Sequence, residues 1–251
     1  MTIRGAPSTS EPGFFDHLEI LRRKLLAVPA LFAAGSVAAF CLMGRIAPVI
    51  EAPLAARGLS LYAFKPQERF TAYCFLALSC GLLVGIPALV VALASFVAPG
   101  LTARERRLLV PFCVSLILFG AMGIAFAWLV IVPFAVGFFA GFAGDAITRE
   151  LWSVEAYYSF VVTVLGGTGM VFLTPPIILA AVKIGLLSPR TLAAYRRHAV
   201  VAIFIIAAIV TPPDVASQLL VGIPLYVLFE LTVLVARLFA RPMQEAEHGS
   251  T

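Results

Sequence analysis

The side chains that could do chemistry in this sequence are a few carboxylates that stand beside arginines or inside apolar stretches. Glu19 precedes Arg22 by three residues, and Glu105 has an arginine on each side. Asp214 and Glu230 lie within the C-terminal apolar region. An acid in such surroundings is costly unless it is paired or hydrated, and a carboxylate binds arginine best in bidentate geometry. These acids are therefore candidates for binding a cationic ligand or a polar partner.

Each acid also has a purely structural interpretation. Glu19 could pair with an arginine one helical turn away, a contact worth a few tenths of a kcal/mol. Glu105 could be a solvated loop residue, and Asp214 could cap the last helix beside Thr211. For Glu230, a functional and a structural role are equally well supported. The residues alone leave these alternatives open.

The motifs of common enzyme classes are absent from the sequence. It has no His-Glu-x-x-His, no Gly-x-Ser-x-Gly and no phosphate-binding loop. The three histidines lie outside the apolar stretches or at their edges, and the four cysteines lie inside apolar stretches without metal-ligand spacing. We therefore expect no catalytic residue, no metal site and no cofactor, so that energy for any work must come from an ion gradient or a partner.

The composition excludes a soluble globular domain. Of the 251 residues, 61% are apolar and 12% are charged, whereas soluble domains have roughly 45–50% and about 25%. The net charge of +5 is not gathered into a basic stripe with interleaved aromatic residues, so nucleic acid is not an expected partner. The chain is expected to lie in a membrane.

Long stretches with few or no charges predict the membrane spans, since a helix needs about 20 residues to cross a bilayer. There are five such stretches: 25–44, 70–103, 108–144, 156–182 and 199–236. The last is too long for one span, and its sequence Thr-Pro-Pro-Asp at 211–214 predicts a turn. It therefore gives two short helices, at about 199–211 and 215–237. The expected fold is an all-α polytopic membrane protein of six transmembrane helices.

The positive charges predict which side of the membrane the termini occupy. Six spans put both ends on one side, and that side receives 13 of the 18 Lys and Arg residues. Both termini are therefore expected in the cytoplasm, and the first span is too long for the core of a signal peptide. We expect a flexible N-terminus at 1–13, a single six-helix membrane domain at 14–240 and a flexible cytoplasmic tail at 241–251.

Glycines and prolines inside the spans predict how the helices pack. The pairs Gly81-x-x-x-Gly85 and Gly137-x-x-x-Gly141 would allow close contact between helices. Prolines inside several spans imply kinked helices, which suit a concave assembly better than a straight bundle.

Five groups of residues follow one another over about residues 14–240. They are His17-Leu18 with Leu21-Arg22; Pro99-Gly100-Leu101 through Glu105-Arg106-Arg107-Leu108 to Pro111; Gly123 through Phe126 to Pro133-Phe134 with Gly137-Phe138; Thr211-Pro212-Pro213-Asp214 with Ser217-Gln218; and Ile223-Pro224 with Tyr226 and Glu230. In this order and spacing, on six spans, they resemble the TatC family, the polytopic receptor subunit of the twin-arginine protein translocase.

The resemblance implies a glove-shaped receptor with two short final helices, which binds twin-arginine signal peptides of folded precursors at the cytoplasmic face. It also implies single-span TatA and TatB partners, an oligomeric complex in the cell inner membrane, contact with its lipid, and transport driven by the proton-motive force. The signal-peptide site carried over from the family is Glu105, Glu19, Arg22 and Arg106. The partner or intramembrane polar residues are Thr211, Asp214, Ser217, Gln218 and Glu230.

Two positions depart from the family pattern. The family usually has His-Leu-x-Glu-Leu-Arg, whereas here the acid is Glu19 and Ile20 occupies the expected position. One residue corresponds to about 100° of rotation around a helix, so Glu19 is expected to contribute less than Glu105. Leu173 stands where the family commonly has a polar residue in the fourth span.

Two other functions compete with the translocase receptor. A six-span secondary transporter of a small solute would show related halves and facing ionisable groups at the midplane. The sequence has no detectable repeat, and its acids lie toward the two membrane faces. A purely structural membrane scaffold is the third candidate.

Overall fold

The chain is almost entirely helical. Its structure, a computed structural model, describes residues 14–100, 102–142, 151–210 and 215–248. The elements are α1 (Phe14–Cys41), α2 (Met43–Ala55), β1 (Leu61–Tyr62), α3 (Glu68–Val97), η1 (Ala98–Gly100), α4 (Ala103–Phe126), η2 (Ala127–Ile131), α5 (Val132–Phe142), β2 (Trp152–Ser153), α6 (Val154–Val171), α7 (Thr174–Lys183), α8 (Pro189–Ala194), α9 (Arg196–Val210) and α10 (Val215–His248).

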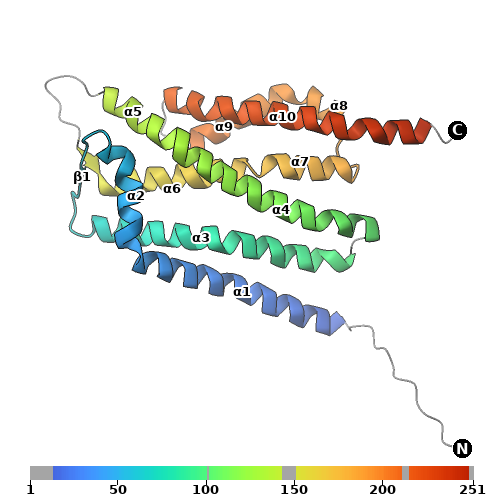
Figure 1. Cartoon of the computed structure of the whole chain (residues 1–251), viewed down its shortest axis with the longest axis horizontal. Coiled ribbons are helices and arrows are strands. Elements are labelled where there is room, and N and C mark those ends of the chain that lie inside the picture. Colours follow the sequence, from blue (N-terminus) through green and yellow to red (C-terminus); the bar gives the residue numbers. More distant parts are fainter. Residues whose placement is uncertain (1–13, 101, 143–150, 211–214, 249–251) are drawn as a thin grey trace, which may run out of the picture.

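Six helical segments correspond to the six predicted spans, namely α1, α3, α4 through α5, α6 with α7, α9, and α10 (Figure 1). Four of these are long and apolar enough to cross a bilayer, and a fifth qualifies if the bent pair α1–α2 counts as one span. The remaining helix, α9, has 15 residues and a rise of about 22 Å, less than the hydrocarbon core of about 30 Å. The short helix expected here is confirmed.

The last helix differs from the expectation. We expected it to be short and to end near residue 237, but α10 has 34 residues and continues to His248. Only its apolar part, Gln218–Leu238, qualifies as a membrane span, with 21 residues. The helix thus continues beyond the apolar stretch and through Pro242. The flexible tail expected from residue 241 stays a prediction.

The third span is continuous, as predicted, despite Pro133. A span of 36 residues runs from Arg106 to Gly141, and it contains one π-helical turn, η2, just before the proline. The N–H of Val132 donates to the carbonyl of Ala127, five residues back. This wider turn presents Ile131 and Val132 to the core, where each is at most 1% exposed and packs in one cluster with Val161 of α6. The proline is thus accommodated by a local change of helical pitch.

The first two spans, α1 and α3, pack together at a close approach of their backbones. A Cβ added at Gly81 of α3 would lie 2.6 Å from the carbonyl oxygen of Phe32 in α1, and one added at Gly85 would lie 3.5 Å from the Phe32 Cβ. The close helix contact predicted for this glycine pair is confirmed, because only a residue without a side chain fits at Gly81.

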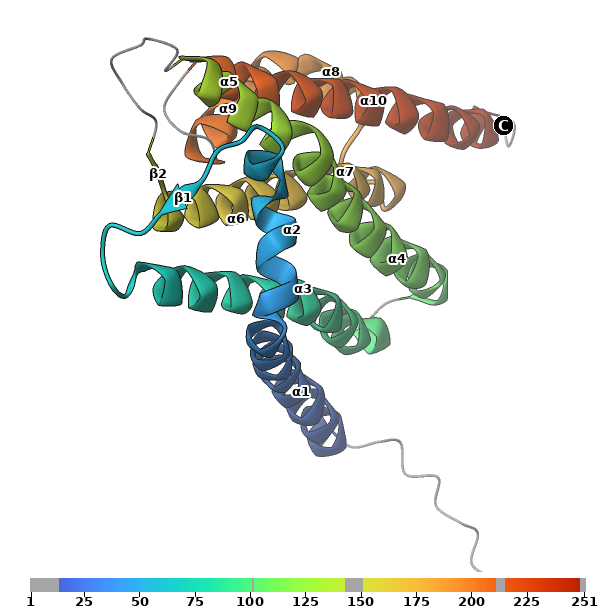
Figure 2. The same cartoon turned by 60° about the vertical axis from the view of Figure 1, so that its left-hand side comes forward.

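The two ends of the molecule differ in what they carry. The start of α1, the end of α10 and the turn from α3 to α4 lie at one end, which we call the terminal end (Figure 1). The opposite end carries α2, β1 and β2, which together with the first turns of α3 and α6 we call the cap. The helix α2 leaves α1 at a bend of 76° and runs across the neighbouring helices (Figure 2).

The cap was not predicted from the sequence. Strand β1 pairs with β2 in parallel, with Leu61 opposite Trp152 and Tyr62 opposite Ser153. Each strand has two residues, which is too short for an alternating pattern to be recognisable. The pairing joins the segment before α3 to the segment before α6.

Candidate functional site

In the described part of the chain, the cap contains a buried acid with four hydrogen bonds. Glu68, the first residue of α3, is 3% exposed. One of its carboxylate oxygens accepts the Ser153 hydroxyl at 2.5 Å and the Glu155 N–H at 3.0 Å. The other accepts the N–H groups of Phe64 at 2.6 Å and Lys65 at 3.2 Å. The carboxylate therefore ties the start of α3 to β2 and to the start of α6.

Two adjacent tyrosines tie α6 to α2 in the same region. The hydroxyl of Tyr157 donates to the backbone carbonyl of Ile50 at 2.6 Å, and that of Tyr158 donates to the Glu51 carboxylate at 2.8 Å. Both tyrosines are at most 2% exposed. Their large rings fill the space below α2 while their hydroxyl groups satisfy polar groups of α2.

An arginine joins the cap to the third span. Arg57 donates from Nη2 to the carbonyl of Pro133 at 3.1 Å, and its guanidinium occupies the space where a Cβ at Gly137 would lie. Gly137 thus makes room for the Arg57 side chain rather than for a neighbouring helix. A Cβ added at Gly141 would meet no atom of the described residues within 4 Å. The helix contact predicted for this second glycine pair is wrong.

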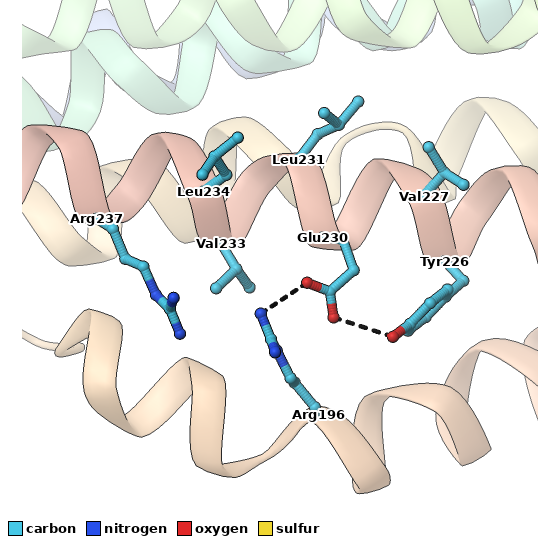
Figure 3. Close-up of a pocket in the computed structure, with 8 residues that line it drawn as sticks. All are labelled: Arg196, Tyr226, Val227, Glu230, Leu231, Val233, Leu234 and Arg237. Carbon is cyan, nitrogen blue, oxygen red and sulfur yellow. Dashed lines mark hydrogen bonds and ion pairs between the residues drawn. The ribbon is translucent and has the colours of Figure 1, made fainter.

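A second polar cluster lies between the start of α9 and the middle of α10 (Figure 3). Arg196, the first residue of α9, forms an ion pair with Glu230 of α10 at 2.8 Å, and the Tyr226 hydroxyl donates to the other oxygen of Glu230 at 3.0 Å. The Arg196 and Glu230 side chains are 43% and 29% exposed. Glu230 is therefore paired inside the fold, which accounts for an acid in an apolar helix.

Nearer the other end of the same two helices, Gln218 makes a hydrogen bond between them. Its side-chain amide donates to the backbone carbonyl of Phe204 in α9 at 3.0 Å. Together with the ion pair, this bond links α9 and α10 at two levels along their length. Gln218 is half-buried, so it is not fully withdrawn from the surface of the pair.

The predicted signal-peptide residues lie at the terminal end. Glu19 and Arg22 are in the second and third turns of α1, while Glu105 and Arg106 are in the first turn of α4. Both of these helix starts lie at that end (Figure 1). The side chains of the first three are outside the described part of the structure, and Arg106 is exposed. From the sequence alone, Glu105 could be a solvated loop residue, but in the structure it is a helical residue. An acid in the first turn of a helix is stabilised by the helix dipole.

The remaining predicted residues fall on or beside the turn between α9 and α10. Thr211 and Asp214 lie outside the described residues, so the proposed cap of Asp214 on the last helix stays a prediction. Ser217 is in the first turn of α10, and its side chain is likewise outside the described part. Of this group the structure describes the contacts of Gln218 and Glu230.

Several residues that organise the site were missed by sequence reasoning. Arg196 was counted only as a positive charge on one side of the membrane, and its pairing with Glu230 crosses 34 positions along the chain. Glu68 received no role, although an acid directly before a long apolar helix needs hydrogen-bond donors or water. That position was the available signal, but the donors from Ser153 and Glu155 could not be inferred without the fold.

Comparison with known proteins shows the same fold and family. The family model described as "Sec-independent protein translocase protein (TatC)" matches residues 16–224. A solved structure titled "Crystal Structure of Twin Arginine Translocase Receptor- TatC in DDM" superposes with a TM-score of 0.77 at 28% sequence identity, covering 88% of this chain and 99% of that chain.

Relatives come from bacteria and chloroplasts. The TatC protein of Desulforapulum autotrophicum is 31% identical over 237 residues, which are 93% of this chain and 87% of that protein. The chloroplastic TATC of Pisum sativum is 35% identical over 226 residues, 89% of this chain and 63% of that protein. The TatCy protein of Bacillus subtilis is 28% identical over 238 residues, 94% and 93% of the two chains.

The six helical segments and the polar contacts at their ends define a polytopic α-helical membrane protein. Since the family model covers most of its length and the fold is that of a solved TatC receptor, the chain belongs to the TatC family. It is a subunit of the twin-arginine, or Sec-independent, protein translocase, a non-enzymatic transport component that works with other Tat subunits. The secondary transporter considered above is not favoured.

Proposed function

We propose that this subunit binds the twin-arginine signal peptide of folded precursors at its terminal end, with Glu105 as the principal carboxylate. The observation that supports this assignment is the position of Glu105 in the first turn of α4, at the end of the molecule where α1 also begins (Figure 1). Glu19 and Arg22 on α1, and Arg106 on α4, complete the proposed site.

The chemistry of the site follows from its charges. Glu105 stands between arginines in the sequence, so its carboxylate is either neutralised by them or shared with an incoming pair of guanidinium groups. A charge-assisted hydrogen bond contributes about 1.5–3 kcal/mol. Loss of one carboxylate that faces an arginine should therefore weaken peptide binding by roughly one to two decades.

The test is peptide binding by purified protein at fixed salt, because exposed charges are screened. Glu105→Gln should reduce the affinity for a twin-arginine peptide by roughly tenfold or more, and Glu19→Gln should reduce it less, because Glu19 is displaced by one residue from the family register. The control is Glu155→Gln, which removes an exposed acid at the cap end. Wild-type affinity in Glu105→Gln would show that the signal peptide binds elsewhere.

Partner binding is proposed at the hairpin of α9 and α10, in which α9 is short with 15 residues. Where a helix is shorter than the bilayer, either the lipid thins or a neighbouring helix covers the gap. Thr211, Ser217 and Gln218 offer hydroxyl and amide groups there to a single-span subunit of the TatA or TatB type, with Asp214 at the turn and Glu230 supporting the hairpin from within. Each such interhelical bond is worth about 0.6–2 kcal/mol.

This partner site is testable by cross-linking. Cysteines placed at Thr211 or Gln218 should form disulfide cross-links to a cysteine in the span of the partner, since both positions lie on or beside the hairpin. A cysteine at Leu82, exposed on α3, is the control. Cross-links at Leu82 and none at the hairpin positions would contradict the proposal.

The proposed setting is a cell inner membrane, with both termini in the cytoplasm, in an oligomeric complex driven by the proton-motive force. The support for the orientation is the excess of Lys and Arg on the side of the termini. A reporter fused after Arg241 should be active inside the cell and one fused at Asp145 outside. The reverse result would invert the topology.

A further inference from the structure

A pocket between α9 and α10 contains more positive charge than its single ion pair neutralises. It has a volume of about 300 Å³ and is lined by Arg196, Tyr226, Glu230 and Arg237 together with valine and leucine side chains of α10. In Figure 3 both arginine side chains lie on the side of α10 that faces α9. With two arginines and one glutamate, the pocket has a formal charge of +1.

The Arg196 guanidinium has donors beyond the one in its ion pair. Its Nη2 is bonded to Glu230 at 2.8 Å, and both oxygens of Glu230 already accept bonds, one from Arg196 and one from Tyr226. A guanidinium carries five N–H donors, and the Arg196 side chain is 43% exposed. This side chain therefore favours a ligand that brings its own acceptor oxygen.

Arg237 is the second donor. It lies seven residues beyond Glu230 on α10, about 10 Å along the helix axis, and its side chain is exposed. The apolar part of α10 ends at Leu238. Arg237 is therefore at the level where an apolar helix leaves the hydrocarbon and meets the lipid headgroups, and Arg196 lies deeper.

The neighbouring face of α10 is apolar and exposed. Val227, Leu231 and Leu234 line the pocket and are each about half exposed, at 50%, 53% and 55%, and in Figure 3 they point away from the two arginines. Such side chains offer a surface for the acyl chains of a lipid whose headgroup reaches the arginines around the helix. A free anion would use only the charged part, whereas a lipid would use both parts.

We propose that this pocket binds the phosphate group of an anionic phospholipid, with the guanidinium groups of Arg196 and Arg237 as donors and the leucines of α10 against the acyl chains. Basic pockets at helix ends are suited to anionic headgroups, and guanidinium groups match phosphate oxygens in geometry. With the termini in the cytoplasm, the lipid belongs to the cytoplasmic leaflet. The proposal does not depend on the signal-peptide site, since none of its residues is part of that site.

The test is lipid binding to the purified full chain in nanodiscs or mixed micelles, with phosphatidylglycerol as the probe and phosphatidylcholine as the neutral reference. Wild-type protein should prefer phosphatidylglycerol. Arg237→Gln should weaken this preference about fivefold, the factor expected for one arginine near an anionic lipid. Arg197→Gln is the matched control, since Arg197 is exposed, follows Arg196 directly and does not line the pocket.

A second variant tests the Arg196 guanidinium without breaking the ion pair. Arg196→Lys retains a cation for Glu230 but has a single ammonium group in place of the guanidinium with its five donors, so it should also weaken the preference for phosphatidylglycerol. Its thermal stability should stay near that of wild type, which separates lost binding from lost folding. Equal binding of the two lipids by wild type, or equal losses in Arg237→Gln and Arg197→Gln, would overturn the proposal.

Inorganic phosphate distinguishes the two possible sources of the anion. If millimolar phosphate displaced phosphatidylglycerol from the wild-type protein, the pocket would be a site for a soluble anion and the assignment to lipid would be wrong. We expect no displacement, because free phosphate gains nothing from the apolar side of the pocket.

Discussion

The cap and the α9–α10 pair are both held by polar contacts, but they are built differently. In the cap, Glu68 and Tyr157 are at most 3% exposed, and their long-range hydrogen bonds join segments 85 to 107 positions apart in the sequence. Between α9 and α10, the Arg196–Glu230 pair is 43% and 29% exposed. Buried hydrogen bonds between segments distant in sequence fix one arrangement of the helices. Half-exposed polar contacts between two consecutive helices allow those helices to shift relative to each other.

This difference in burial means that the rigid part and the more adaptable part of the receptor lie in separate regions. The cap fixes the ends of α3, α5 and α6 through α2, β1, β2 and Arg57. The α9–α10 pair borders a pocket and has many exposed apolar side chains. The surface proposed for partners and lipid is thus the one with fewer internal constraints, as is common for binding regions.

Removing the Glu68 charge should have the largest effect on stability. Glu68→Gln keeps the shape but replaces an acceptor oxygen by an NH₂ group that faces N–H or O–H donors. We expect the midpoint of thermal unfolding in detergent to fall by about 5 °C or more. The exposed neighbour Glu155→Gln is the control and should change the midpoint little. If both variants unfold together, the cap is not the rigid region.

Tyr157→Phe should have an intermediate effect. It removes one buried hydroxyl and leaves the carbonyl of Ile50, which the hydroxyl bonds at 2.6 Å, without that donor. The expected loss in the free energy of unfolding is about 1–2 kcal/mol, measured by denaturant titration in mixed micelles. The same substitution at Tyr62, which is 47% exposed, should change it by less than about 0.5 kcal/mol.

Of these contacts, the ion pair between α9 and α10 should contribute least to stability. In a double-mutant cycle with Arg196→Met and Glu230→Gln, the coupling energy should be below about 1 kcal/mol, as for other partly exposed pairs. A coupling of several kcal/mol would mean that this pair is as constrained as the cap, and the contrast between the two regions would be lost.

The sequence was sufficient to predict the membrane spans but not the structure of the segments that connect them. Charge-free stretches predicted six helical segments because burial in lipid requires apolar side chains and internal backbone bonds. They did not predict α2, β1 and β2, whose short segments are specified by contacts with residues far along the chain. The continuation of α10 to His248 was missed for a related reason, since hydropathy marks the end of an apolar stretch and not the end of a helix.

Candidate site residues could be named from the sequence only where one local stretch carries a recognisable motif. Glu105 and Gln218 were singled out by their local motifs. The partner of Glu230 was not, because Arg196 is brought to it by the packing of α9 against α10. The role of Glu68 depends on Ser153 and Glu155, which only the folded chain brings near.

The parallel pairing of β1 with β2 has a consequence for the order in which the protein is made. Glu68 and its donor Ser153 are separated by 85 positions, and a ribosome adds about 5–20 residues per second. Glu68 is therefore synthesised roughly 4–17 s before the hydroxyl that it bonds, and two further passes through the membrane intervene. During that interval its carboxylate has only the N–H groups of Phe64 and Lys65 and the surrounding water. The cap is thus a late step of assembly, completed when the third span has been inserted and the fourth is beginning.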